Sequence, residues 1–280
     1  MKYAIFIYGQ FRSFEHNLEN NLKAIQESIL KNNEIDIYIV TDRKGNYSKN
    51  NEEKIINIFN KYKCNVKFIK FWEDLQDYHS KETINMNNYD KNCKHVYGKD
   101  SFTSNLWYRR FISNKIKNEY CLANKLEYDL HMFIRLFDTT IKQNLKDEII
   151  KDKIEDCIKN NKLLMSIDTI FIGKKSIIDE VFSFGENFQV YHDIIWNNFS
   201  LVNYFKLIDW GLYSRENKPT YCSEIQIFCH IFYNNIFCEN IRFDHCNPSL
   251  EENKFTLFHV ILCDKRHNFI GKDNAQLVYF

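Results

Sequence analysis

The chain has 280 residues, of which 44% are hydrophobic and 16% aromatic, so it is long and apolar enough to bury a core. Its 7 glycines and 2 prolines exclude collagen-like and linker-rich chains and argue against an all-β fold with many turns. The 38 basic and 37 acidic residues give a formal net charge of +1, which excludes the strong positive field that recruits nucleic acid. We therefore expect a folded protein without a nucleic-acid partner.

In chain order, the first third alternates between strands and helices. A run of β-branched and aromatic residues over 2–8 predicts a buried strand, and Leu18, Leu22, Ile25 and Ile29 at helical spacing predict the helix after it. The same patterns predict a strand at 35–40, a helix at 51–62 and a strand at 64–71. This βαβαβ order is typical of a parallel sheet of the nucleotide-binding type.

The region 72–104 is polar and lacks periodicity, which predicts a long loop with room for one short helix. Beyond it, helices are predicted at 106–126, 174–184, 191–205 and 223–234. Strands are predicted at 128–136, 163–172 and 236–243, the second of these as one strand or a pair. No break in composition demands a domain boundary, so we expect a single α/β domain over 1–280.

Membrane and export signals are missing from the sequence. No run of about 18 apolar residues occurs, so we expect no membrane-spanning helix. The apolar start carries Arg12 and Glu15 early and lacks a small-residue cleavage site, which argues against a signal peptide. We interpret the 9 cysteines as reduced, because they form no CxxC pair and several lie in apolar runs. A zinc site among the cysteines and histidines of 222–246 is the alternative, although the spacings do not fit common zinc patterns. We expect a cytoplasmic protein.

The end of the first strand carries a candidate binding site, because open α/β sheets bind ligands at the carboxyl ends of their strands. Gly9 lets a ligand approach the backbone, Gln10 offers an amide, and Arg12 offers a cation for phosphate. The second strand ends in Thr41 and Asp42, and Asp42 is a further candidate for binding a nucleotide. An ordinary first strand followed by a surface arginine would give the same pattern.

The middle strand, in the stretch 128–140, delivers Arg135 and Asp138 near its carboxyl end. Asp138 could hold a divalent ion that bridges nucleotide phosphates, and Arg135 could balance the charge of a departing diphosphate. The alternative is a helix-capping aspartate and a buried arginine–carboxylate pair. Two later carboxylates also allow two interpretations each. Asp168 could bind a sugar hydroxyl or sit in a turn, and Glu224 could act as a base or occupy the first turn of a helix.

Several of these segments occur in an order that resembles a known family. They are the strand ending in Gly9-Gln10, the Leu106–Tyr108 segment, the stretch 128–138, the stretch 168–173 and the Ser-Glu pair at 223–224. Over roughly residues 3–235 this order is similar to GT-A-type glycosyltransferase-like proteins of giant DNA viruses, bacteria and algae. The resemblance implies a GT-A-like, mixed and mostly parallel sheet flanked by helices. It also implies transfer of a sugar from a nucleotide-sugar donor to a glycan, protein or small-molecule acceptor.

The resemblance assigns roles to the candidates. Gly9, Gln10 and Arg12 would lie at the nucleotide pocket, with Arg135 and Asp138 at the donor centre. Asp168, Gly173 and Glu224 would match the later segments, with Asp168 or Glu224 acting on the acceptor hydroxyl. Trp107, Tyr108, Tyr191, Trp196 and Trp210 could stack on sugar rings or pack in the core.

The resemblance also implies Mn²⁺ or Mg²⁺ at Asp138, usually held by an Asp-x-Asp pair. Here Leu136 and Thr140 stand at the two positions where a second aspartate would complete the pair. A non-catalytic nucleotide-sugar or carbohydrate-binding protein on the same fold is therefore the alternative, and a purely structural or interaction protein is a third. We expect a donor-side half at 1–140 and an acceptor-side half at 141–280, and for a viral protein a place in the host cytoplasm or virion.

Overall fold

The computed structural model describes residues 1–9, 14–43, 49–79, 101–137, 141–143, 146–166 and 169–187, with 227, 230–231, 234–240 and 243–244. The chain divides into two compact units. Unit 1 comprises Met1–His79, Ile112–Glu180 and Ile241–Pro248, and unit 2 comprises Ser80–Phe111, Val181–Asn240 and Ser249–Phe280. Each unit contains residues from both expected halves, 1–140 and 141–280. The assignment of a donor side and an acceptor side to these halves stays a prediction.

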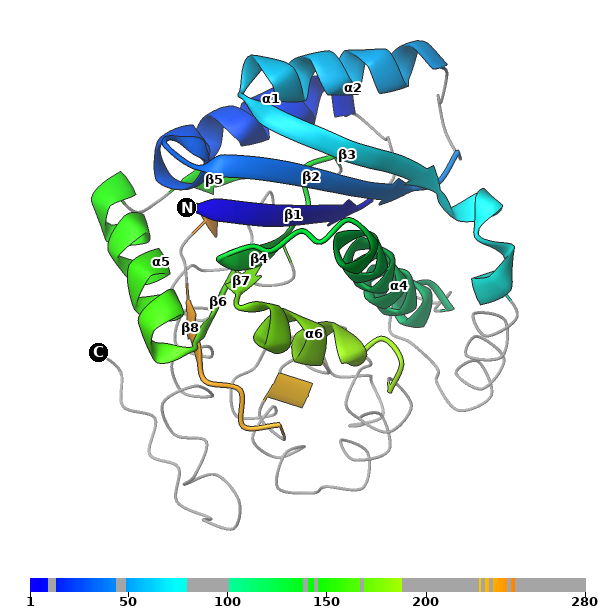
Figure 1. Cartoon of the computed structure of the whole chain (residues 1–280). Coiled ribbons are helices and arrows are strands. Elements are labelled where there is room, and N and C mark those ends of the chain that lie inside the picture. The colour runs from blue at the N-terminus through cyan, green and yellow to red at the C-terminus, as the bar shows by residue number, and fades with distance from the viewer. Residues whose placement is uncertain are drawn as a thin grey trace, which may run out of the picture. The chain divides into compact units, whose positions relative to one another are not determined.

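Unit 1 contains a central sheet (Figure 1). Its strands are β1 (Lys2–Tyr8), β2 (Glu34–Thr41), β3 (Cys64–Phe71), β4 (Leu130–Ile134), β6 (Leu163–Ser166) and β7 (Ile170–Gly173). The short strands β5 (Lys142–Gln143) and β9 (Phe243–Asp244) pair with each other. The helices are α1 (Phe14–Ala24), the π-helix η1 (Gln26–Leu30), α2 (Lys49–Lys61), the 3₁₀ helix η2 (Trp72–Asp74) and α5 (Asp147–Asn160). Both α4 (Ser101–Ala123) and α6 (Lys175–Ser183) cross the boundary between the units, and β8 (Cys238–Asn240) belongs to unit 2.

The strands of unit 1 follow the order β3-β2-β1-β4-β7-β6. β1 pairs in parallel with β2 on one side and with β4 on the other, and β2 pairs in parallel with β3. β7 is antiparallel to both β4 and β6. The predicted mixed, mostly parallel sheet flanked by helices is therefore confirmed. Because the chain steps outward from β1 to β3 and then returns to the other side of β1, the strand order reverses between β1 and β4.

One face of this sheet is apolar and carries the main core. Ile5 and Ile7 of β1 lie on it, together with Leu18 and Leu22 of α1 and Phe59 of α2, all of them fully buried. Figure 1 shows α1 and α2 side by side over this face. Ile150, Ile154 and Cys157 of α5 join the same cluster. Removing such side chains from water supplies about 1.5–3 kcal/mol each, which holds these helices against the strands.

The opposite face is polar where the part of α4 after Ile112 covers it. Lys117 is fully buried, and its Nζ lies 2.7 Å from His131 Nδ1 of β4 and 4.9 Å from the centre of the Phe6 ring. Burial lowers the pKa of Lys117 from 10.5 to about 7, against the opposing charge of Asp179. Burial, with the charge of Lys117 added to it, also lowers the pKa of His131. Burial therefore favours the neutral form of both side chains.

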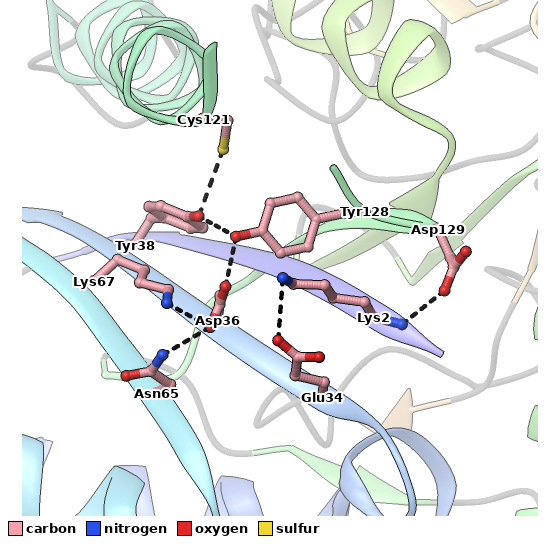
Figure 2. Close-up of polar contacts among 9 residues, drawn as sticks. All are labelled: Lys2, Glu34, Asp36, Tyr38, Asn65, Lys67, Cys121, Tyr128 and Asp129. Atoms are coloured by element: carbon pink, nitrogen blue, oxygen red, sulfur yellow. Dashed lines mark hydrogen bonds and ion pairs between the residues drawn. The ribbon is translucent and has the colours of Figure 1, made fainter. Parts of the chain in front are cut away.

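A second polar network ties the amino-terminal ends of the strands together (Figure 2). The buried Asp36 of β2 accepts hydrogen bonds from Tyr128 Oη at 2.6 Å and Asn65 Nδ2 at 3.0 Å, and Lys67 Nζ lies 3.2 Å from its Oδ1. Tyr128 also hydrogen-bonds Tyr38. These partners satisfy a carboxylate that would be costly to bury alone.

The structure corrects several sequence-based expectations. The helix α5 was not expected, although its isoleucines at helical spacing mark it, and it ends at Asn161 in the left-handed conformation. α4 begins at Ser101, inside the predicted loop, so residues 101–104 are helical. The stretch 163–172 forms the pair β6 and β7. The predicted helix at 191–205 lies outside the described residues. Of the predicted helix at 223–234, residues 227 and 230–231 are described as helical and 234 as a turn.

The cysteines are not all reduced. Cys64, Cys121 and Cys157 are free and buried, as predicted, but Cys238 is disulfide-bonded. The prediction that every cysteine is a free thiol is therefore wrong, because a disulfide needs two thiols close in space and no particular sequence spacing. The bond also removes Cys238 from the zinc alternative. The compartment of the protein stays a prediction.

In unit 2, the described aromatic side chains form a core around Trp107 and Phe184. The Trp107 ring lies 5.1 Å from that of Phe184 and 6.1 Å from that of Phe182, between ring centres. The Arg110 guanidinium lies 4.6 Å from the centre of the Trp107 ring. For Trp107 the core-packing interpretation therefore holds, since its side chain is fully buried.

The Lys117→Met variant should alter how stability depends on pH. In the wild type, the unfolded lysine keeps its proton up to about pH 10.5 and the folded one only up to about pH 7, so the free energy of unfolding should rise with pH between these values. The slope from this group is at most about 1.4 kcal/mol per pH unit. Urea unfolding from pH 7 to pH 10 should show the wild-type slope exceeding that of the variant. Equal slopes would mean that Lys117 stays charged in the fold.

Gly185→Ala should strongly destabilise unit 2. A Cβ at Gly185 would lie 2.1 Å from the Trp107 carbonyl oxygen and 2.8 Å from Phe111 Cβ, so backbone must move. Overpacking of this kind costs about 1–3 kcal/mol or more. Gly173→Ala is the matched control, because its Cβ would lie 3.2 Å from Ile177 Cγ2 and 3.5 Å from the Lys162 carbonyl oxygen, far less crowded than at Gly185. A melting temperature for Gly185→Ala at or above that of Gly173→Ala would contradict this packing.

Candidate functional site

The carboxyl ends of the parallel strands meet at one edge of the sheet, which we call the carboxyl edge. Figure 1 shows β1, β2 and β3 pointing toward the same side. Tyr8 at the end of β1 pairs with Val40 near the end of β2, and Phe6 pairs with Phe133 of β4. The residues just after these strands therefore lie next to one another, on both sides of the point where the strand order reverses. Open α/β sheets bind ligands in the crevice at this kind of position.

Gly9 and Asp42 follow β1 and β2 at this edge. Thr41 Oγ1 donates a hydrogen bond of 2.6 Å to the Gly9 carbonyl oxygen, so the ends of the two strands are tied by a side chain as well as by the sheet ladder. Thr41 is fully buried and Asp42 is 1% exposed. The chain after β1 and the chain after β2 are thus held together, and the buried carboxylate of Asp42 lies beside this bond. We call these two joined strand ends the frame.

Arg135 follows β4 at the same edge. Its backbone N–H donates a hydrogen bond of 2.9 Å to the Thr169 carbonyl oxygen, which directly precedes β7. Its side chain is half-buried, whereas the strand residues before it are fully buried. The antiparallel partner β7 therefore fixes the backbone of Arg135 and leaves its guanidinium within reach of solvent.

Helix α1 holds the chain just beyond Arg135. Asn21 Nδ2 donates to the Leu136 carbonyl oxygen at 2.9 Å, and Asn21 Oδ1 accepts from the Ile141 N–H at 2.7 Å. One turn earlier, Asn17 Nδ2 donates to the Phe137 carbonyl oxygen at 3.1 Å. Both asparagines are buried. The helix that leaves β1 is thus hydrogen-bonded to the segment that leaves β4.

Of the predicted site residues, the structure brings Gly9, Asp42 and Arg135 to the carboxyl edge, and Gly173 lies at the far end of β7 from it. The others lie outside the described residues: Gln10, Arg12, Asp138, Asp168 and Glu224. Their predicted roles stay predictions. Among the aromatic candidates, Trp107 and Tyr108 are buried, and Tyr191, Trp196 and Trp210 lie outside the described residues.

Sequence reasoning did not single out Arg43 as part of this edge. Its guanidinium makes two hydrogen bonds to the carboxylate of Asp74, at 2.7 and 2.5 Å, and its backbone N–H donates to Glu73 Oε1 at 2.9 Å. This ties the exit of β2 to η2 beyond β3. The signal was the position of Arg43 directly after a strand, but its acidic partners come thirty residues later and no local pattern pairs them.

The described residues contain neither a cluster of metal ligands nor a membrane-spanning helix. Among the described residues, no group of three or more His, Cys, Asp or Glu side chains is arranged to hold a metal ion. Within the same ranges, none of the helices combines the length and apolar character needed to span a bilayer. Neither finding bears on Asp138, which is not among these residues.

No protein-family model matches the sequence, and no curated protein matches it. Among solved structures, mouse xyloside xylosyltransferase 1 in its apo form is similar with a TM-score of 0.44 and 8% identity, over 86% of this chain and 85% of that one. S. aureus TarS is similar with a TM-score of 0.40 and 10% identity, over 98% of this chain and 41% of that one. TarS 1-349 gives 0.38 and 12%, over 98% and 74%. At these scores the function has to be argued from the site itself.

Thr41→Val should weaken the frame between the first two strand exits. Valine keeps the shape of threonine but leaves the Gly9 carbonyl oxygen without this hydrogen bond, which costs about 1–3 kcal/mol when the group is buried. The free energy of unfolding, measured in urea, should fall by that amount. If the variant is as stable as the wild type, the Thr41 hydroxyl does not hold the Gly9 carbonyl in solution.

Proposed function

We propose that this protein is a GT-A-type glycosyltransferase, which moves a sugar from a nucleotide-sugar donor to a glycan, protein or small-molecule acceptor. The observation that carries the proposal is the placement of Gly9, Asp42 and Arg135 at adjacent strand exits, on both sides of the reversal in strand order. Such a position is where open α/β sheets bind nucleotides. The ordered motifs that resemble the GT-A-type family supply the type of reaction.

The donor would bind along the carboxyl edge. The backbone at Gly9 allows close approach of the nucleotide, and the carboxylate of Asp42 can accept hydrogen bonds from its base or ribose hydroxyls. Gln10 and Arg12 follow Gly9 directly in the sequence and would complete this half of the site.

Transfer breaks the bond between the anomeric carbon of the sugar and an oxygen of the diphosphate, which leaves with the electron pair. A guanidinium at Arg135 suits this leaving group, because it can donate two parallel hydrogen bonds to phosphate oxygens. The acceptor hydroxyl forms the new bond to the anomeric carbon and gives up its proton. Asp168 and Glu224 are the candidate bases for that proton.

A divalent metal at Asp138 would need oxygen ligands besides this carboxylate. Mn²⁺ and Mg²⁺ favour about six oxygen ligands, and Asp138 lacks a second aspartate at positions 136 and 140. We therefore assign the neutralisation of the diphosphate to Arg135 and leave Mn²⁺ or Mg²⁺ as a variable of the experiment.

The second candidate is a non-catalytic nucleotide-sugar or carbohydrate-binding protein on the same fold. The incomplete acidic pair around Asp138 favours it, since loss of a metal ligand lowers turnover before it abolishes binding.

Thermal-shift measurements with UDP-, GDP- and dTDP-sugars, each with and without Mn²⁺, separate these functions. Stabilisation by one donor together with slow release of its nucleoside diphosphate supports the transferase, because water can replace the acceptor. Stabilisation without any release supports the binding protein. If no nucleotide sugar raises the melting temperature, the transferase and the nucleotide-sugar-binding alternative both fail.

Asp138→Asn should reduce release of the nucleoside diphosphate by about 100-fold or more if this carboxylate acts at the donor centre. The melting temperature should change little, because the substitution keeps the size of the side chain. Asp152→Asn, an exposed aspartate on α5, is the matched control and should retain wild-type turnover. Full activity in Asp138→Asn would remove Asp138 from the site.

A further inference from the structure

Asn21 joins two points of the chain that follow β4. Its side chain is fully buried on α1, and its amide donates to the carbonyl of Leu136 and accepts from the N–H of Ile141. A single side chain thus holds both ends of the stretch 136–141. This stretch begins directly after Arg135 and includes Asp138.

The amide of Asn21 suits both bonds. Leu136 offers a carbonyl acceptor and Ile141 offers an N–H donor, and the amide donates with its nitrogen and accepts with its oxygen. A carboxylate cannot donate, and an aliphatic side chain can do neither. Because both backbone groups are buried, losing the amide leaves two polar groups without these partners.

Asn17 strengthens the same attachment. It lies one turn before Asn21, on the same side of α1, and donates to the Phe137 carbonyl oxygen at 3.1 Å. Leu136, Phe137 and Ile141 are therefore held by two neutral side chains of one helix. That helix follows the exit of β1, so it couples the two strand exits that flank the reversal in strand order.

We propose that Asn21 is a positioning residue for the diphosphate end of the donor site, with Asn17 in support. The inference rests on the proposed function, because it takes the segment after β4 as the part of the site that meets the phosphates. Nucleotide base and ribose would meet the exits of β1 and β2, whereas these two hydrogen bonds of Asn21 go to the segment after β4. Displacing a group that contacts the reacting atoms by about 1 Å can cost a factor of about 100, so this attachment should govern phosphate binding and turnover.

The test compares nucleoside diphosphates with their monophosphates. The wild type and Asn21→Ala are titrated by calorimetry with UDP, GDP and dTDP and with UMP, GMP and dTMP, in the presence of Mn²⁺. For the base that the wild type prefers, Asn21→Ala should bind the diphosphate about tenfold more weakly and the monophosphate within about twofold of the wild type. A general loss of stability would weaken both ligands alike.

Asn33→Ala is the matched control. Asn33 Nδ2 donates to the Ile29 carbonyl oxygen at 2.8 Å, so this variant also loses an asparagine-to-backbone hydrogen bond, but just before β2 at the opposite edge of the sheet. It should keep the wild-type ratio of diphosphate to monophosphate affinity. If Asn33→Ala changes that ratio as much as Asn21→Ala does, the positioning role is overturned.

Hydrogen exchange gives a readout independent of ligands. The Ile141 amide should exchange at least tenfold faster in Asn21→Ala than in the wild type, while amides of β1 and β2 keep their protection. If Asn21→Ala does not fold, Asn17→Ala replaces it, with a smaller loss of diphosphate affinity expected. Equal loss of diphosphate and monophosphate affinity, or no loss, would overturn the inference alone. Absence of nucleotide binding in the wild type would overturn the proposed function, and the inference with it.

Discussion

The parallel pairing of β1 with both β2 and β4 is the constraint on which the rest of the structure depends. Because β1 lies between them, the exits of all three strands meet at one edge, and the chain must reverse its direction of travel across the sheet there. Hydrogen bonds hold these exits together. Thr41 bonds the end of β2 to Gly9 after β1, and Asn21 of α1 bonds the chain that follows β4.

The two faces of the sheet are stabilised by different kinds of interaction. The face under α1, α2 and α5 is held by apolar burial, whereas the face under the later part of α4 contains Asn114, Lys117 and His131. On α6, burial of Asp179 opposes its ionisation, but hydrogen bonds from Lys175, Asn114 and Asn118 outweigh it and lower its pKa. A polar layer of this kind specifies one position for a helix, because any sliding leaves buried polar groups unsatisfied.

Sequence patterns predicted the strands and the first helices well, since the β-branched runs of β1 and β2 are buried on both sides and allow few other structures. They failed where a helix buries polar residues. Leu122 of α4 is 83% exposed, whereas the buried positions of this helix include Asn114, Lys117 and Cys121. The strand exits Gly9, Asp42 and Arg135 could be predicted from position alone. Asn17 and Asn21 could not, because their partners lie more than a hundred residues away and are backbone atoms without a sequence signature.

Three of the side chains that attach the segments at the carboxyl edge to one another carry no charge. Asn17, Asn21 and Thr41 are neutral at every physiological pH, so these attachments do not change as protons are gained or lost. Lys117 and His131, whose pKa values burial lowers, lie on the α4 face and act on the stability of the fold. Any pH dependence of turnover measured well within the range where the fold is stable would therefore report the acid–base groups of the reaction, and not the attachment of the segment after β4.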